Sequence, residues 1–203
     1  NVMAKISTDN DAAGAEAADH LAETMGDTGE VLIFAHDSRS LTTQERVDGF
    51  AQKMQADHPG ITVGNTYYLD ELEELKQTIA DEINGGTYAR EGQEAAPIED
   101  EGNRVAAEDI SDEEAMDYIF AKNPDATAIY GTSGEAVMAA VENTQRLEKE
   151  DMSIVGFDAT EEEAQALEDG LVEGLIAQNP YGMGYATVVA CSRAILEIGN
   201  EAE

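Results

Sequence analysis

The chain has 203 residues, and 11 Lys plus Arg against 44 Asp plus Glu give a formal net charge of −33. A surface this negative repels the phosphates of nucleic acids and of anionic lipids, so neither is expected as a partner. With 42% hydrophobic residues the chain is too apolar for a disordered acidic tail, and no apolar run approaches the ~18 residues of a membrane-spanning helix. We therefore expect a soluble globular protein with no segment inserted in a membrane. Its acidity fits two explanations, adaptation to high salt and a surface kept soluble by its charge.

The chain repeats a pattern in which a short apolar run is followed by a segment of helical period. Such runs are typical of buried strands, and apolar residues recurring every three or four positions are typical of helices packed on a sheet. The repeated βα units predict an α/β fold with a doubly wound, mostly parallel sheet covered on both faces. The predicted strands are Val2–Ile6, Val31–Ala35, Ile61–Tyr68, Ala126–Tyr130, Ser153–Phe157 and Leu175–Ala177.

Polar residues mark where several of the predicted helices begin. Asp9 and Asn10 can cap the first helix, and Pro180 suits the first turn of the last one. Three patterns resemble capping boxes: Thr42-x-x-Glu45, Ser111-x-x-Glu114 and Thr160-x-x-Glu163.

Between Asn84 and Asp109 the helical period weakens, and glycine, proline and acidic residues become frequent. We expect an inserted acidic loop over about residues 84–109. Its charge and weak period favour a mobile excursion, and the alternative is an element that binds a partner.

Polar side chains follow the predicted strands, and ligands of open α/β sheets bind beyond the carboxyl ends of the strands. Carboxylate, guanidinium, amide and hydroxyl groups beside an aromatic ring suit a polyhydroxylated ligand such as a sugar. The candidates are His36, Arg46, Tyr67, Tyr68, Ser133, Asp158 and Gln178.

Two of these candidates have simpler explanations. Arg46 is expected in the first turn of a helix, where a cation opposes the helix dipole and needs local compensation. Either it serves a pocket or it forms a surface ion pair with Glu45 or Asp48. Asp158 either contacts a ligand or caps the helix that begins near Thr160.

No catalytic or cofactor motif is present in the sequence. Glu135 stands where a G-x-S-x-G nucleophile elbow needs its second glycine, so Ser133 is predicted to be a helix N-cap. Dinucleotide-binding and metal-ligand spacings are missing, and we expect neither an enzyme nor a cofactor or metal. The lone Cys191 lies in an apolar stretch and is predicted to be a buried structural thiol.

Three stretches together resemble a known family. They are Ser153-Ile-Val-Gly-Phe-Asp158, Leu175-Ile-Ala-Gln178-Asn-Pro-Tyr-Gly-Met-Gly184, and Gln44-Glu-Arg46-x-x-Gly49-Phe50, with Thr8-Asp9-Asn10-x-x-x-Gly14 before them. In order and spacing they are similar to the type I periplasmic binding proteins of sugar ABC importers, related to ribose-binding protein. The resemblance covers nearly the whole chain.

The resemblance implies roles for individual residues. Arg46, Asp158 and Gln178 would hydrogen-bond a sugar, with an aromatic contact from Tyr67 or Tyr68. Ser133 stands where ribose binders tend to carry Asn, so ribose itself is not implied.

The family has two α/β lobes, and this chain resembles the second, with about 100 residues of a first lobe expected before Val2. Residues 1–179 would form the ligand-binding lobe, and residues 180–203 would cross back toward the first lobe. Hinge closure around the ligand would then present both lobes to a membrane permease.

The resemblance implies an extracytoplasmic protein, in the periplasm or held as a lipoprotein on the outer face of the cell membrane. It would bind a sugar or polyol and deliver it to an ABC importer. The alternative is a ligand-sensing effector domain of a lactose-repressor-like regulator or of a receptor, since these share the fold.

Overall fold

The computed structural model describes residues 4–90, 92–149 and 151–196. A five-stranded parallel sheet in the order β2-β1-β3-β4-β5 forms its centre. The strands are β1 (Gly29–Ala35), β2 (Ile61–Tyr68), β3 (Ala126–Gly131), β4 (Ser153–Phe157) and β5 (Gly174–Ile176). Five of the six predicted strands are thereby confirmed, each within about two residues.

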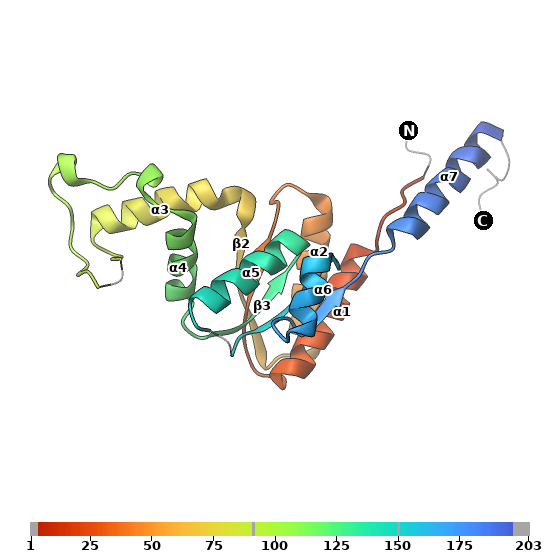
Figure 1. The fold of residues 1–203 in the computed structure, drawn as a ribbon, viewed down its shortest axis with the longest axis horizontal. Coiled ribbons are helices and arrows are strands. Elements are labelled where there is room, and N and C mark those ends of the chain that lie inside the picture. The colour runs from red at the N-terminus through yellow and green to blue at the C-terminus, as the bar shows by residue number, and fades with distance from the viewer. Residues whose placement is uncertain (1–3, 91, 150, 197–203) are drawn as a thin grey trace.

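Helices cover both faces of the sheet (Figure 1). One face packs on α1 (Asn10–Met25) and α2 (Leu41–Asp57), and the other on α4 (Asp112–Lys122), α5 (Gly134–Arg146) and α6 (Glu161–Glu168). The remaining helices are α3 (Leu72–Gly85) and α7 (Pro180–Leu196), with short 3-10 turns η1 (Leu69–Glu71), η2 (Glu101–Asn103) and η3 (Ala107–Asp109). The doubly wound α/β fold predicted from the repeats is confirmed.

Strand side chains alternate between the two layers because successive residues of a strand point to opposite faces. Val31 and Ile33 of β1 pack with α1 and α2, whereas Leu32 and Phe34 pack with α4 and α5. All four are at most 1% exposed, as expected of a central strand covered on both sides.

The predicted strand Val2–Ile6 is wrong for the residues that the structure describes. Residues 4–9 have no regular structure and lead into α1, while Val2 and Met3 lie outside the described residues. An apolar run this short also suits an extended segment, and the period of its side chains does not distinguish the two.

Helix caps largely follow the predictions. Asp9, Ser111, Ser133 and Thr160 are the N-caps of α1, α4, α5 and α6, and capping boxes form at Ser111 and Thr160. Thr42 is not a cap, because α2 begins two residues earlier and Ser40 accepts the hydrogen bond from the Thr43 amide.

The acidic insertion makes hydrogen bonds and packing contacts with the rest of the lobe. Asn84 donates to the Val105 carbonyl at 2.8 Å and accepts from the Val105 amide at 2.9 Å. Tyr88, Ile98 and Val105 pack against a small apolar cluster that includes Ile83 of α3 and Tyr118 of α4. The described part of this segment therefore contacts the lobe at these points, and both its mobility and its role as a partner-binding element stay predictions.

Helix α7 projects away from the lobe (Figure 1). None of its described residues is buried, and Cys191 is exposed, so the predicted buried thiol is wrong for this chain. Within the described ranges, no helix has both the length and the apolar character that crossing a membrane requires.

Candidate functional site

The candidate site lies where the carboxyl ends of the parallel strands meet along one edge of the sheet. From β1 the chain adds β2 on one side of the sheet, and from β3 it adds β4 and β5 on the other side. The direction in which strands are added therefore reverses between β1 and β3. Ligands of open α/β sheets gather at such a reversal. Ser133, Asp158 and Gln178 follow β3, β4 and β5 at this edge, as the sequence predicted.

Asp158 is the centre of a hydrogen-bond chain at this edge. Its Oδ2 accepts from the Gly134 amide at the start of α5 at 3.2 Å, and its Oδ1 accepts from Gln178 Nε2 at 2.6 Å. Gln178 Oε1 in turn accepts from the Thr8 hydroxyl at 2.8 Å. The N-cap of α6 is Thr160, so the alternative that Asp158 caps this helix is wrong.

Asp158 has a backbone conformation that residues other than glycine rarely adopt. Its φ is +75°, in the left-handed region, while its amide donates to the Ile176 carbonyl at 3.1 Å. Asp tolerates this region better than most residues, and such positions are frequent at functional sites. In this conformation the Asp158 carboxylate contacts the start of α5 and Gln178.

Arg46 is buried, at 6% exposure, beside the same edge. Its Nε donates to Asn10 Oδ1 at 3.0 Å, its Nη1 donates to the Thr132 carbonyl at 2.6 Å, and its Cζ lies 3.9 Å from the centre of the Phe157 ring. Burial lowers the pKa of Arg46, and the negative charge of Asp158 opposes that shift. The guanidinium is therefore fixed in position before any ligand arrives.

Both sequence arguments about Arg46 need correction. It is the sixth residue of α2, beyond the first turn, so its charge is little affected by the positive end of the helix. It forms no surface ion pair with Glu45 or Asp48.

Asn10 is a site residue that the sequence analysis treated only as a helix cap. It is 2% exposed and donates to Glu45 Oε2 at 3.0 Å and to the Thr8 carbonyl at 3.1 Å. Its side chain therefore links α1 to Arg46 on α2. The sequence around a polar residue at the start of a helix does not indicate its contact with Arg46, because the two positions are 36 residues apart.

Ser133 and His36 line the edge with their polar groups already engaged. Ser133 is half-buried and caps α5 by accepting from the Ala136 amide at 3.3 Å. His36 Nδ1 lies 3.4 Å from the Thr132 hydroxyl and 3.3 Å from the Thr43 hydroxyl. The predicted cap at Ser133 is confirmed, and its contact with a ligand stays a prediction.

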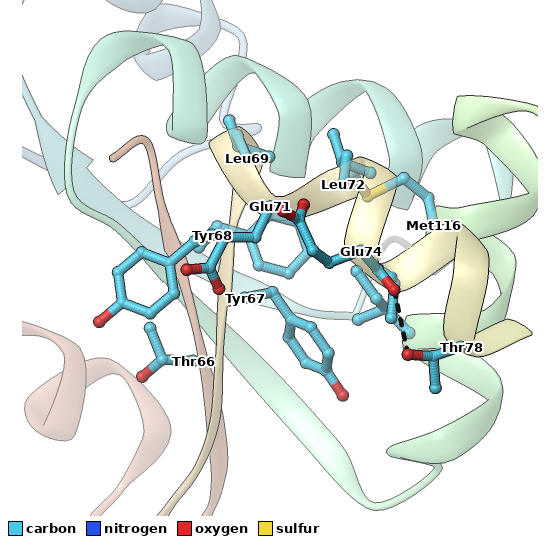
Figure 2. A pocket seen from close by; sticks show the side chains of 12 residues that line it. Thr66, Tyr67, Tyr68, Leu69, Glu71, Leu72, Glu74, Thr78 and Met116 are labelled. Carbon is cyan, nitrogen blue, oxygen red and sulfur yellow. Dashed lines mark hydrogen bonds between the residues drawn. The ribbon is translucent and has the colours of Figure 1, made fainter. Parts of the chain in front are cut away.

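Tyr67 and Tyr68 point to opposite sides of β2 (Figure 2). Tyr67 faces the core, with its ring 6.4 Å from that of Phe34 and its hydroxyl accepting from Asn123 at 2.7 Å. Tyr68 is half-buried, and burial raises its pKa. Within the described residues no hydrogen bond or ring contact joins Tyr68 to the Asp158 chain, so the aromatic wall of the site stays a prediction.

In the part of the chain that the structure describes, no group of three or more His, Cys, Asp or Glu is arranged to hold a metal ion. The chemistry of the edge is that of hydrogen-bond donors and acceptors around one cation and one carboxylate, which can hold a neutral polar ligand.

Known proteins share this fold. The ribose import binding proteins of Haemophilus influenzae and Escherichia coli are 23% and 21% identical over 195 and 194 residues, each match covering 96% of this chain. The chain spans about half of these relatives, since the matches cover 53% of each.

Solved structures of other solute-binding proteins also resemble this chain. GanP, a glucose-galactose binding protein from Geobacillus stearothermophilus, superposes with a TM-score of 0.71 at 23% identity, covering 97% of this chain and 57% of that one. An ABC transporter solute binding protein from Agrobacterium vitis, bound with alpha-D-tagatopyranose, gives 0.69 at 24% identity, covering 95% and 53%. These superpositions show that the chain has the same α/β fold as the matched parts of both proteins.

The model of the periplasmic binding protein domain family matches residues 1–90 and 88–199. Together these segments span almost the whole chain, including every strand of the sheet and the edge that carries Arg46, Asp158 and Gln178. The chain therefore belongs to the periplasmic binding protein family.

Proposed function

We propose that this chain is the second lobe of an extracytoplasmic solute-binding protein that binds a sugar or polyol and delivers it to an ABC importer. The ribose import binding proteins and the sugar-binding neighbours in fold support this ligand class. Residues 1–179 would form the lobe and residues 180–203 would cross toward the first lobe, with residues 1–3, 91, 150 and 197–203 of these ranges lying outside the described part of the chain. The permease of the importer is the membrane partner, and attachment as a lipoprotein is one way to keep the protein at the outer face of the membrane.

The hydrogen-bond chain from Gly134 through Asp158 and Gln178 to Thr8 carries this proposal. A carboxylate and an amide that are oriented by neighbours lose little conformational freedom when a hydroxylated ligand binds. Sugar hydroxyl groups can donate to Asp158 and accept from the cation of Arg46. Asp158 and Arg46 would hold the ligand by hydrogen bonds alone, so the lobe would bind the ligand without changing it chemically.

The edge forms one wall of the pocket, and the first lobe supplies the other. Asp158 and Gln178 are half-buried here, so their remaining exposed surface is available to a ligand. Closure of the two lobes would remove that surface from water and strengthen each polar contact. The lactose-repressor-like or receptor alternative uses the same pocket and differs in the partner that detects closure.

The test is a thermal-shift screen of the full-length protein against pentoses, hexoses, polyols and inositols, followed by calorimetry with the sugar that shifts the midpoint. Ligand bound to the folded state raises the midpoint by mass action. Asp158→Asn keeps the side-chain shape and tolerates positive φ, and we expect it to weaken binding at least about tenfold.

Asp125→Asn is the matched control, because Asp125 is exposed at the opposite end of β3. It removes the same charge and should leave the affinity unchanged. Unchanged affinity of a folded Asp158→Asn protein would remove Asp158 from the site. If no sugar or polyol moves the midpoint, the ligand belongs to another class.

A further inference from the structure

A cavity of about 200 Å³ lies at the carboxyl end of β2 (Figure 2), and no residue of the Asp158 hydrogen-bond chain lines it. Its floor is apolar, formed by the buried core residues Phe34, Met116 and Ile119. Leu72 and Leu75 of α3 also line the cavity and pack against the same core. Polar partners for water are scarce on such a floor, so an apolar occupant that displaces water is favoured.

The rim of the cavity is acidic. Glu71 and Glu74 line it and are exposed, and within the described residues neither forms an ion pair. Asp70, beside them, accepts from the Ser38 amide and hydroxyl at 2.9 and 3.0 Å. Tyr68 also lines the cavity, and its pKa is raised by burial first and then by Glu71, Asp48 and Asp70. The rim thus has a negative potential that would attract a cation.

The size of the cavity selects among occupants. Pockets for free small molecules usually enclose about 300–1,000 Å³, and this one is smaller. It has room for one large side chain, the kind of anchor that dominates the energy of protein interfaces. Unpaired carboxylates at the rim favour Lys or Arg on either side of that anchor.

We propose that this cavity is a docking site for a segment of a partner protein that inserts one large apolar side chain between basic residues. The cavity opens beside the end of β2, at the same edge of the sheet that carries Asp158 and Gln178. A partner bound there would contact the lobe beside its ligand pocket and would share Tyr68 with the predicted aromatic wall of that pocket. The proposal goes beyond sugar binding and does not depend on the identity of the sugar.

Met116 provides a local signal for the test. The full-length protein is labelled with ¹³C-methyl methionine, and the Met116 signal is assigned as the one lost in Met116→Leu. The probe is a five-residue peptide, Lys-Lys-Phe-Lys-Lys, with blocked ends. We expect the Met116 methyl signal to move and saturate as peptide is added, because the phenylalanine ring enters the cavity beside it.

Two further peptides and three variants separate anchoring from simple charge attraction. Replacing Phe by Gly, or every Lys by Glu, should abolish the Met116 shift. Glu71→Gln combined with Glu74→Gln should weaken binding about fivefold or more. Glu73→Gln removes a charge from the same helix outside the cavity and should have little effect. Thr78→Met should occupy the cavity with a side chain of its own and block the peptide.

The proposal is overturned if millimolar Lys-Lys-Phe-Lys-Lys leaves the Met116 signal in place, or if the Gly peptide moves it equally. Equal loss of binding in Glu73→Gln and in the double variant would also overturn it. The labelled sample is then titrated with sugars. Failure of sugar binding would leave the peptide result unchanged, so the two proposals fail separately.

Discussion

Tyr130 of β3 is the largest of the fully buried side chains in the described chain. Its ring stacks on Phe50 with centroids 4.1 Å apart and an angle of 7°, and it lies against Phe157, the ring that also supports Arg46. Its hydroxyl is buried without a hydrogen-bond partner among the described residues, and burial raises its pKa. The aromatic ring stabilises the core, whereas burying a hydroxyl that has no protein hydrogen-bond partner costs free energy.

Tyr130→Phe should therefore stabilise the lobe, by about 1 kcal/mol, because it removes an uncompensated polar group and keeps the stacking. Tyr118→Phe is the matched control. That hydroxyl is also buried in part but donates to Glu82 Oε1 at 3.0 Å, so its loss should cost about 1–2 kcal/mol. Urea unfolding of the three proteins measures both values. A larger loss for Tyr130→Phe than for Tyr118→Phe would contradict this account.

At the scale of single residues, the sequence predicted where a residue lies in the fold better than it predicted which residue it hydrogen-bonds. Asp158 and Gln178 could be placed at the edge because each directly follows an apolar run that became a strand. Thr8 and Asn10 could not, because their partners Gln178 and Arg46 lie far along the chain. Such contacts depend on how α1 and α2 cross, which no local pattern specifies.

The crossing of α1 and α2 depends on two glycines in contact with opposing backbone. A Cβ on Gly14 would collide with the Arg46 carbonyl, and one on Gly49 would collide with the Asp11 carbonyl. The two helices therefore approach backbone to backbone, which brings Asn10 within 3.0 Å of Arg46. Packing at this distance is possible only where side chains are missing.

Gly49→Ala should force the helices apart and destabilise the lobe by about 2 kcal/mol or more, since the backbone cannot yield as a flexible side chain would. Sugar affinity should fall as well, because Arg46 is held by Asn10 across this contact. Gly85→Ala is the control, with open space around the added methyl group at the end of α3. It should be neutral or slightly stabilising by helix propensity. Equal midpoints of thermal unfolding for the two variants would refute the close crossing.

At the scale of elements, long periodic segments were predicted well and irregular ones were not. The helices of the βα units follow from apolar period and capping residues, both of which are local. The composition of the insertion gave no sign of the two hydrogen bonds that join Asn84 and Val105, which are 21 residues apart. Composition measures the average tendency of a segment and misses a few specific tertiary contacts.

At the scale of the whole molecule, α7 is the element that this lobe does not explain. Tyr181, Tyr185, Val188 and Ile195 recur on one side of the helix, and Tyr181 and Ile195 are 84% and 81% exposed. A helix with so apolar an exposed stripe is expected to be buried against another element. The proposed first lobe would supply that surface, since residues 180–203 are expected to cross toward it.

Cys191 lies three residues after Val188 and four before Ile195, on the side of α7 that carries the stripe. It is exposed in this chain and should become buried where α7 packs on a first lobe. We expect its reaction with a soluble disulfide reagent, followed by mass spectrometry of the Cys191 peptide, to be about 100-fold slower in the full-length protein than in the 203-residue chain. The control thiol is Asp125→Cys in a Cys191→Ser background, far from α7 at the opposite edge of the sheet, and it should react equally fast in both proteins. Equal rates for Cys191 in both would mean that α7 does not pack on a first lobe, and its apolar stripe would then have to be covered by a different partner.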